Sequence, residues 1–508
     1  MEKRDVILRA EQLMKEHFGY SSFRSAQETL IESLMKGRDV LGIMPTGAGK
    51  SMCYQIPALM LPGITLVISP LISLMQDQVR ALKAAGIAGA YLNSSLSYRQ
   101  YLKALDNARM GMYKIIYVAP ERLETQEFLR FAQEADISLL AVDEAHCVSQ
   151  WGHDFRPSYM GIAPFVEKLR KRPVVAAFTA TATPAVKDDI LEHLKLREPQ
   201  VSVTGFDREN LFFSVMRPLD KKEALFEFLS QHREESGIVY CSTRKQVEKL
   251  TELLREKGFR AARYHAGLDE VERREGQTEF VFDRIPIMVA TNAFGMGIDK
   301  RNVRFVVHYN MPKNMEAYYQ EAGRAGRDGA KAECLLLYGA GDVHTAEYLI
   351  NTSVEDTQDP KEAAKRKEIE LKKLEDMKGY CFHTGCLRNY ILSYFGQQEE
   401  TPCDNCGTCR AKKNIFAALQ VEPKKPYMTE RSLYDMLKSV RADFAERKEL
   451  PPELIFSDRT LTVMAKEKPK TEYEMMQIPG ISPVNYRMYG PTFLRVIQRN
   501  LHRRSGVE

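Results

Sequence analysis

A glycine-rich loop that ends in a lysine and a serine is the first feature of this 508-residue chain that could do chemistry. Val40–Ile43 predicts a strand, Met44–Ser51 predicts the loop, and a helix follows, which is the order that a phosphate-binding loop requires. Glycines let backbone N–H groups face an anion, and the dipole of the following helix strengthens that preference. Lys50 can reach the β- and γ-phosphates of a nucleotide, and Ser51 can bind Mg²⁺.

The loop match is one residue short, because Met44 stands where the motif has glycine. A glycine-rich turn without function is the alternative, and the strand–loop–helix order argues against it. We therefore expect the phosphates of ATP to be bound by Thr46, Gly47, Ala48, Gly49, Lys50 and Ser51.

Two adjacent carboxylates, Asp143 and Glu144, follow the apolar run Leu139–Val142. An aspartate at the end of a strand can hold Mg²⁺, and the neighbouring glutamate can orient and polarise an attacking water. An isolated Asp-Glu pair after a strand is usually a surface turn. Combined with the Lys50–Ser51 loop, the pair makes hydrolysis of a nucleoside triphosphate the leading chemistry.

Two arginines three residues apart, Arg324 and Arg327, occupy a glycine-containing turn in the second half of the chain. Such arginines can neutralise the transition-state charge on a γ-phosphate that another lobe binds, and they link nucleotide state to motion between lobes. A basic surface loop is the alternative. The residues alone do not assign which arginine reaches the phosphate.

A short segment after the carboxylates gathers aromatic and cationic side chains, including the single tryptophan. Stacking of bases on such side chains is worth ~1–3 kcal/mol per base and depends little on sequence. A small hydrophobic cluster beneath a loop is the alternative. The candidate DNA-binding residues are Trp151, His153, Phe155, Arg156 and Tyr159.

Five of the nine cysteines lie within residues 381–409. Cys386, Cys403, Cys406 and Cys409 have the spacing C-x₁₆-C-x₂-C-x₂-C, and four thiolates can close a tetrahedral Zn²⁺ site. The sequence shows no secretory signal, which favours a metal site over disulfides. Cys381 and His383 are spare donors, so Cys386 is the least certain ligand, and an iron–sulfur cluster is a chemical alternative.

The composition is that of an ordinary globular protein, with 44% hydrophobic and 28% charged residues, and excludes collagen-like and wholly disordered chains. Residues 51–76 carry no charge over a length that could span a bilayer, but their prolines break the run, so we expect no membrane partner. Residues 410–508 hold 19 Lys and Arg against 12 Asp and Glu. This basic tail suggests a polyanionic partner, although a solvated surface explains it equally well.

Apolar runs alternate with amphipathic helical stretches from residue 38 to 340, which predicts an α/β fold with two parallel sheets. Helices are expected at Arg244–Lys257 and Asp269–Val281, and a small all-helical unit at Leu433–Leu501. The expected strands are Val40–Ile43, Thr65–Ile68, Lys114–Val118, Ser138–Val142, Val174–Phe178, Gly237–Tyr240, Ala261–Tyr264, Ile287–Ala290, Arg304–His308 and Cys334–Leu337.

These motifs together resemble those of helicase superfamily two and, within it, the RecQ family over about residues 8–345. The resemblance is carried by residues 18–27, 69–75, 119–123, 179–182, 264–268, 290–299 and 318–329, in addition to the loop and the carboxylates. It implies that Tyr20, Arg24 and Gln27 contact adenine. It also implies that the aromatic segment senses single-stranded DNA, and that the cysteine cluster is a structural zinc site.

The resemblance implies two tandem RecA-like lobes at 1–205 and 206–345, a helical zinc-binding module at 346–411, a linker at 412–428 and a helical HRDC-like domain at 429–508. Family members often carry a winged-helix domain between the zinc module and the tail. Here only about twenty residues separate Cys409 from Leu433, whereas a domain needs at least ~50. In the family this domain supplies contacts to duplex DNA and strand-separating elements, so its absence bears on duplex affinity and on the efficiency of unwinding.

By this resemblance the chain is expected to be an ATP- and Mg²⁺-dependent DNA helicase that moves 3′ to 5′ and acts in repair and recombination. Its expected partners are single-stranded and tailed duplex DNA, with a single-strand-binding protein as a further candidate. We expect a cytoplasmic location, with nucleoid association if the source is bacterial. The alternatives are an RNA helicase of the D-E-A-H type, a small-molecule kinase, and a DNA-stimulated ATPase that translocates or anneals with little unwinding.

Overall fold

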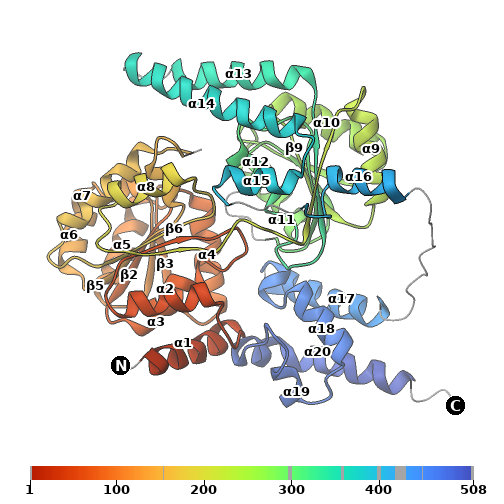
Figure 1. The fold of residues 1–508 in the computed structure, drawn as a ribbon. Coiled ribbons are helices and arrows are strands. Elements are labelled where there is room, and N and C mark those ends of the chain that lie inside the picture. Colours follow the sequence, from red (N-terminus) through yellow and green to blue (C-terminus); the bar gives the residue numbers. More distant parts are fainter. Residues whose placement is uncertain are drawn as a thin grey trace. The chain divides into compact units, whose positions relative to one another are not determined.

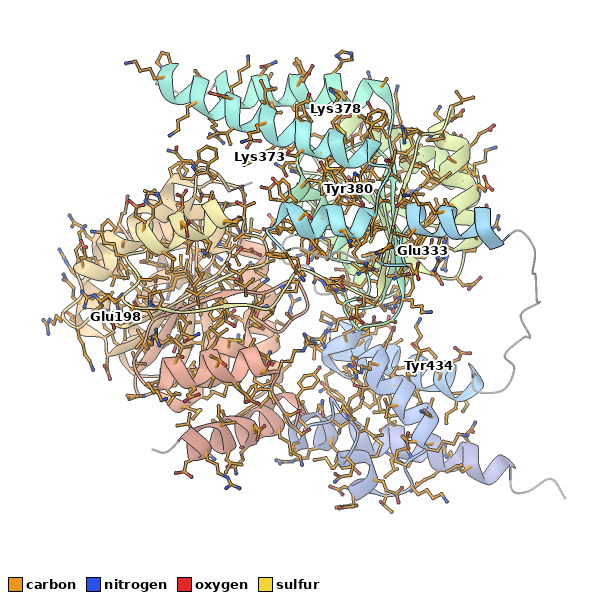
Figure 2. All side chains as sticks on the ribbon, in the orientation of Figure 1. Glu198, Glu333, Lys373, Lys378, Tyr380 and Tyr434 are labelled. Carbon is orange, nitrogen blue, oxygen red and sulfur yellow. The ribbon has the colours of Figure 1, made fainter. Side chains whose placement is uncertain are left out.

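The structure is a computed structural model that describes residues 3–152, 154–295, 300–355, 360–397, 402–417, 431–448 and 450–504. The chain divides into two compact units. The first contains residues 1–205 with the C-terminal helices, and the second contains the residues from Phe206 up to those helices. Each unit is built around one sheet, and side chains fill the layers between sheet and helices (Figures 1 and 2).

The sheet of the first unit has seven strands in the order β3-β4-β2-β5-β6-β1-β7, all paired in parallel. Because the carboxyl ends of parallel strands share one edge, the loops after β1 and β5 emerge on the same edge, on either side of β6. The strands are β1 (Val40–Ile43), β2 (Ile64–Ile68), β3 (Gly89–Leu92), β4 (Ile115–Val118), β5 (Ile137–Val142), β6 (Val174–Thr179) and β7 (Gln200–Val203).

Helices cover both faces of this sheet, with α2 and α3 on one face and α7 and α8 on the other (Figure 1). The central strands are therefore buried on both sides, which explains their continuous apolar sequences. The α-helices are α1 (Lys3–Phe18), α2 (Ser25–Met35), α3 (Met52–Met60), α4 (Ile72–Ala84), α5 (Tyr98–Arg109), α6 (Gln126–Glu134), α7 (Ile162–Glu167) and α8 (Pro184–His193). Short 3₁₀ turns are η1 (Pro120–Arg122), η2 (Ala145–Val148) and η3 (Pro157–Gly161).

The sheet of the second unit has six parallel strands in the order β10-β11-β9-β12-β13-β8. They are β8 (Leu211–Met216), β9 (Ser236–Tyr240), β10 (Ala261–Tyr264), β11 (Ile287–Ala290), β12 (Val303–His308) and β13 (Ala332–Leu337). The helices between them are α9 (Lys221–Gln231), α10 (Arg244–Glu256), α11 (Glu270–Val281) and α12 (Met315–Ala322).

In the described part of the chain beyond the second sheet, the secondary structure is helical. α13 (Ala340–Glu355), α14 (Pro360–Phe382), α15 (Leu387–Tyr394) and α16 (Gly407–Ala417) belong to the second unit. α17 (Arg431–Lys448), η4 (Pro452–Leu454), α18 (Asp458–Glu467), α19 (Glu472–Met476) and α20 (Pro483–Arg504) belong to the first. None of the helices within the described ranges is both long enough and apolar enough to cross a membrane.

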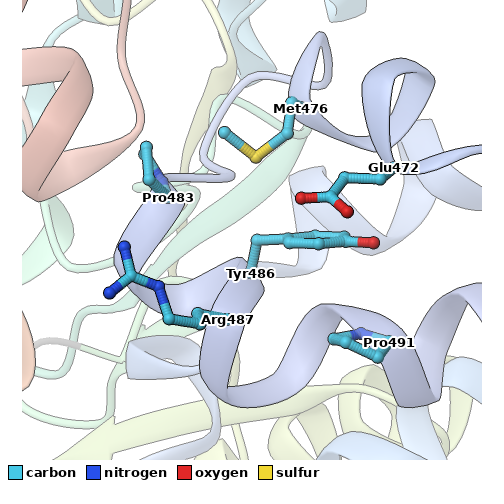
Figure 3. Close-up of a pocket in the computed structure, with 6 residues that line it drawn as sticks. All are labelled: Glu472, Met476, Pro483, Tyr486, Arg487 and Pro491. Atoms are coloured by element: carbon cyan, nitrogen blue, oxygen red, sulfur yellow. The ribbon is translucent and has the colours of Figure 1, made fainter.

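A cavity of about 300 Å³ lies among the C-terminal helices (Figure 3). One acidic and one basic side chain share its otherwise mainly apolar walls, and none of the site residues predicted from the sequence lines it. Its walls are formed by Glu472, Met476, Pro483, Tyr486, Arg487 and Pro491.

All ten predicted strands are confirmed, as are the helices expected near Arg244–Lys257 and Asp269–Val281. The sequence did not reveal β3, β7 and β8. β3 and β7 lie at the edges of their sheet and are only partly buried, and β8 is an edge strand that alternates buried and half-buried residues. Such edge strands lack the continuous apolar run that marks a central parallel strand.

Candidate functional site

The glycine-rich loop leaves β1 and enters α3 with both inner glycines in the left-handed region, Gly47 at φ +82° and Gly49 at φ +83°. Other residues rarely adopt this conformation, and it turns backbone N–H groups toward one side. Lys50 Nζ donates a 3.1 Å hydrogen bond to the Met44 carbonyl, so the ammonium lies over its own loop. Met44, which stands where the motif has glycine, thus supplies a backbone carbonyl to Lys50.

Gln27 bridges α2 and the phosphate loop. Its amide nitrogen donates to the carbonyls of Ala48 and Gly49, each at 3.2 Å, while its amide oxygen accepts from the Arg24 backbone N–H at 2.9 Å. A Cβ on Gly49 would lie 2.5 Å from the Gln27 amide nitrogen, so a larger residue there would displace the Gln27 amide. Tyr20 and Arg24 are exposed beside this bridge.

Asp143 and Glu144 follow β5, two strands away from the phosphate loop on the same sheet edge. Burial and then the neighbouring charge of Glu144 raise the pKa of Asp143 to about 7, and the Lys50 charge opposes this shift. Glu144 takes a left-handed conformation with φ +48°, and its Oε2 is buried without a hydrogen bond among the described residues. A buried, unsatisfied carboxylate oxygen beside a second carboxylate suits a divalent cation and a bound water.

His146 links these carboxylates to the Thr179–Ala182 segment at the end of β6. Its Nδ1 lies 2.9 Å from the Thr179 hydroxyl and 3.4 Å from Glu144 Oε2, and the ring is buried. The Thr179 hydroxyl in turn donates to the Thr181 carbonyl at 3.0 Å. His146 was not among the site residues predicted from the sequence, although its place directly after the Asp-Glu-Ala run could have indicated a role.

Tyr159 is fully buried, and its hydroxyl donates to the Asp143 carbonyl at 2.9 Å. The structure thus places this predicted DNA-stacking residue inside the lobe, behind the carboxylates, with no face open to a base. The other predicted aromatic residues lie differently. The Trp151 side chain is 39% exposed, Phe155 is half-buried, and His153 lies outside the described residues.

The loop that carries Trp151 is fixed at both ends. The guanidinium of Arg156 donates to the Pro70 carbonyl at 2.9 Å and to Asp154 Oδ2 at 2.9 and 3.1 Å. At the turn, a Cβ on Gly152 would lie 2.4 Å from the His146 carbonyl, so the backbone there packs directly against the residue that contacts Glu144. The loop is therefore joined to the residues beside the carboxylates by direct contacts.

In the second unit, the two predicted arginines have different surroundings. Arg324 is 6% exposed, and its guanidinium donates to the Gly295 carbonyl and contacts the Tyr240 hydroxyl. The Tyr240 hydroxyl itself donates to the Phe294 carbonyl at 2.8 Å. Arg327 is only half-buried, three residues further along the same turn.

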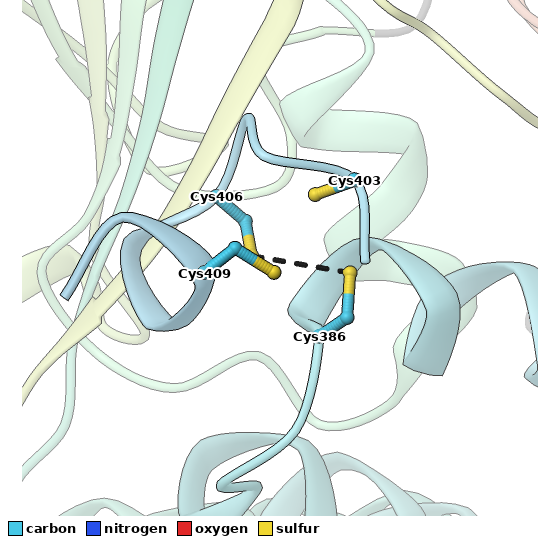
Figure 4. A group of neighbouring side chains, drawn as sticks. All are labelled: Cys386, Cys403, Cys406 and Cys409. Carbon is cyan, nitrogen blue, oxygen red and sulfur yellow. Dashed lines mark hydrogen bonds between the residues drawn. The ribbon is translucent and has the colours of Figure 1, made fainter. Parts of the chain in front are cut away.

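The structure gathers Cys386, Cys403, Cys406 and Cys409, with all four sulfur atoms within 4.8 Å of one another (Figure 4). Tetrahedral zinc with ~2.3 Å Zn–S bonds needs sulfurs about 3.8 Å apart, so the group fits this ion. Burial opposes ionisation of Cys406, but hydrogen bonds from Thr408 and the backbone outweigh it and lower the pKa of the thiol to about 6. Cys381 is buried and is not part of this group.

Comparison with protein families gives four matches along the chain. The model of the DEAD/DEAH box helicase family matches residues 24–189, and that of the helicase conserved C-terminal domain matches residues 220–329. The RecQ zinc-binding model matches residues 340–410, and the HRDC domain model matches residues 430–497. The last two matches are separated only by residues 411–429.

The chain is similar over nearly its full length to curated proteins named ATP-dependent DNA helicase RecQ. The protein from Bacillus subtilis is 38% identical, and the alignment covers 97% of this chain and 99% of that protein. The protein from Pasteurella multocida is 34% identical, with 95% and 92% covered. Among solved structures, the helicase MrfA bound to DNA shares the fold with a TM-score of 0.56 at 18% identity, covering 82% of this chain and 61% of that one.

The B. subtilis alignment runs over 592 positions, whereas this chain has 508 residues, so at least 84 positions face no residue of this chain. This deficit exceeds the ~50 residues that a small domain needs. The short separation between the zinc-binding and HRDC matches is consistent with a missing domain at that point.

Proposed function

The chain belongs to the RecQ family of ATP-dependent DNA helicases, and from this premise we propose that it unwinds duplex DNA with 3′-to-5′ polarity in a Mg²⁺-dependent reaction. We further propose that it acts in DNA repair and recombination on single-stranded and tailed duplex DNA. A single-strand-binding protein is a proposed partner, and the proposed location is cytoplasmic, with nucleoid association if the source is bacterial.

Binding of ATP is assigned to the phosphate loop and the segment before it. Backbone N–H groups of residues 46–51 would surround the phosphates, and Lys50 would exchange the Met44 carbonyl for phosphate oxygens. Tyr20 and Arg24 are exposed, and both would contact the adenine base. Gln27 would contact the base with the same amide that now fixes Ala48 and Gly49, so base recognition and loop geometry would be joined in one side chain.

Mg²⁺ would be held by Ser51 and Asp143, and when bound it would neutralise charge developing on the phosphates. A nearby cation would also offset the burial and the Glu144 charge that raise the pKa of Asp143 to about 7. Glu144 would orient the attacking water through its carboxylate, whose Oε2 has no hydrogen bond within the described residues and lies 3.4 Å from His146 Nδ1. Zn²⁺ would be held by the four clustered cysteines as a structural ion.

Burial supports Arg327 as the residue that reaches the γ-phosphate. Arg324 is enclosed and engaged with Gly295 and Tyr240, so its charge is already used inside its own lobe. Arg327 is half-buried at the same turn, and its charge also acts on the Tyr240 hydroxyl. Its greater exposure is what favours it over Arg324. Arg324 would then fix the turn.

The observation that carries the proposal is the direct connection between the carboxylates and the aromatic loop, through Tyr159–Asp143 and His146–Gly152. DNA stacked on Trp151 would thereby act on the residues that hydrolyse ATP, which is the coupling a DNA-driven motor needs. For the domains, we propose the boundaries 1–205, 206–345, 346–411, 412–428 and 429–508, which are supported by the four family matches.

ATP hydrolysis measured with single-stranded DNA and with RNA of the same sequence tests this function. We expect DNA to stimulate hydrolysis more strongly. Lys50→Ala should still bind DNA but lose about 100- to 1,000-fold in kcat, because a charge that stabilises the transition state is removed. Lys36→Ala is the matched control, since Lys36 is exposed and pairs with Glu32 on the surface of the same lobe. Stronger stimulation by RNA, or hydrolysis retained in Lys50→Ala, would overturn the proposal.

A second candidate is a DNA-stimulated ATPase that translocates or anneals DNA with little unwinding. It is favoured by the at least 84 alignment positions that this chain lacks relative to the B. subtilis protein. ATP hydrolysis without strand separation would identify it.

A further inference from the structure

The two arginines of the second unit are attached directly to helix α12. α12 begins at the N-cap Asn314, whose side chain accepts the Ala317 N–H at 2.8 Å, and it ends at Ala322. The following turn continues its hydrogen bonding, with Arg324 N–H donating to the Glu321 carbonyl at 3.1 Å. The position of Arg324 and Arg327 is therefore set by the position of α12.

α12 is held from behind by helices that come after the second sheet. Tyr318 of α12 and Tyr380 of α14 are both fully buried, and their hydroxyls share a hydrogen bond of 3.0 Å. Their rings lie 5.0 Å apart. Tyr380 extends from α14 into the layer between α14 and α12 (Figure 2).

Two further contacts tie α12 to the same module. The Tyr319 ring packs 5.1 Å from Phe395, which follows α15, and both lie against Phe206, whose carbonyl accepts from the Tyr319 hydroxyl at 2.7 Å. Glu316 is buried, and burial raises its pKa while the charge of Lys373 on α14 lowers it. Since α15 starts at the zinc candidate Cys386, these contacts join α12 to the cysteine cluster.

Residues of α12 also contact side chains that surround Arg324. The Tyr318 ring lies 4.9 Å from His308, whose Nε2 is 2.9 Å from Glu321 Oε2. His308 stacks on Tyr240 at 5.5 Å, and the Tyr240 hydroxyl contacts Arg324. An unbroken buried path therefore runs from Tyr380 through Tyr318 and His308 to Tyr240 and Arg324.

We propose that Tyr380 and Tyr318 are positioning residues for ATP hydrolysis: their hydroxyl pair sets α12 and thereby the arginine that acts on the γ-phosphate. The zinc-binding module then has a function in catalysis itself, as the rigid support of this arginine. This inference rests on the proposed function. Buried hydroxyls left without a partner are costly, so loss of one hydroxyl makes the other seek a new partner and shifts its helix.

Tyr318→Phe and Tyr380→Phe test this, because each keeps the ring and removes only the hydroxyl. We expect each to lower kcat for DNA-stimulated ATP hydrolysis by about tenfold, less than the ~10²-fold cost of a 1 Å misplacement of a catalytic group. KM for ATP, DNA affinity and zinc content should stay at wild-type values. The affinity for ADP with aluminium fluoride, which mimics the transition state, should fall by the same factor as kcat. The double variant should be no slower than either single variant, because one interaction is lost in all three.

Tyr390→Phe is the matched control. Its hydroxyl donates to the Asp376 carbonyl at 2.8 Å within the module, and its ring lies 5.6 Å from Tyr380. The variant therefore removes a hydroxyl next to the Tyr318–Tyr380 pair and leaves the pair itself intact. It should leave kcat unchanged. Wild-type kcat in Tyr318→Phe and Tyr380→Phe, multiplicative losses in the double variant, or an equal loss in Tyr390→Phe would each overturn the inference. An inactive wild-type protein would instead overturn the proposed function.

Discussion

The carboxylates of the first unit and the arginines of the second are positioned in different ways. Asp143 and Glu144 are held by residues of their own sheet unit. Tyr159, which binds the Asp143 carbonyl, lies 16 residues further along the chain. Thr179, which contacts His146, lies 33 residues beyond that histidine. α12 depends on residues at greater distance, with Tyr380 62 residues from Tyr318 and Phe206 113 residues from Tyr319. The carboxylates are therefore positioned by residues of their own lobe, whereas the arginines that follow α12 depend also on the zinc-binding module.

The largest effect on kcat is expected from replacing an arginine of the second unit, and the two arginines should differ in their effect on stability. Arg327→Ala should lower kcat about 10³-fold and leave the melting temperature near wild type, because a transition-state charge is lost from a half-buried position. Arg324→Ala should lower the melting temperature as well, because it leaves the buried Gly295 carbonyl unpaired. ATPase assays and thermal unfolding measure both. Equal effects of the two variants on melting temperature would contradict the distinction.

An intermediate effect is expected from breaking the metal cluster. Cys403→Ser should lose zinc and lower kcat about tenfold or more, since the support of α12 loosens, whereas DNA-independent ATP binding by the first unit should persist. Zinc content by elemental analysis and nucleotide affinity measure this. The control Cys381→Ala changes a buried thiol outside the cluster and should retain one zinc per chain. Zinc loss with unchanged kcat would show that the second unit is as self-contained as the first.

The smallest effect is expected within the first unit. Tyr159→Phe removes the hydrogen bond to the Asp143 carbonyl and should weaken DNA stimulation of ATP hydrolysis about fivefold, in keeping with ~1 kcal/mol for such a bond. Tyr113→Phe, which loses a hydrogen bond to Asn107 elsewhere in the lobe, should behave as wild type. Undiminished stimulation in Tyr159→Phe would mean that coupling does not pass through Asp143.

The sequence was informative where chemistry is encoded by neighbours in the chain. The strand–loop–helix order around Lys50 and the cysteine spacing predicted groups that the structure brings together. It was less informative where a side chain has two possible environments. Tyr159 lies among exposed aromatic candidates in sequence but fills the interior, because its hydroxyl satisfies a backbone carbonyl there. The path from Tyr380 to Arg324 joins distant segments, and no local pattern encodes it.

The decisive measurement is strand displacement on 3′-tailed, 5′-tailed and blunt duplexes with ATP and Mg²⁺. We expect displacement of the 3′-tailed duplex, little of the blunt one, and none by the Lys50→Ala protein. Displacement confined to the 5′-tailed duplex, or equal displacement without ATP, would contradict an ATP-driven 3′-to-5′ motor.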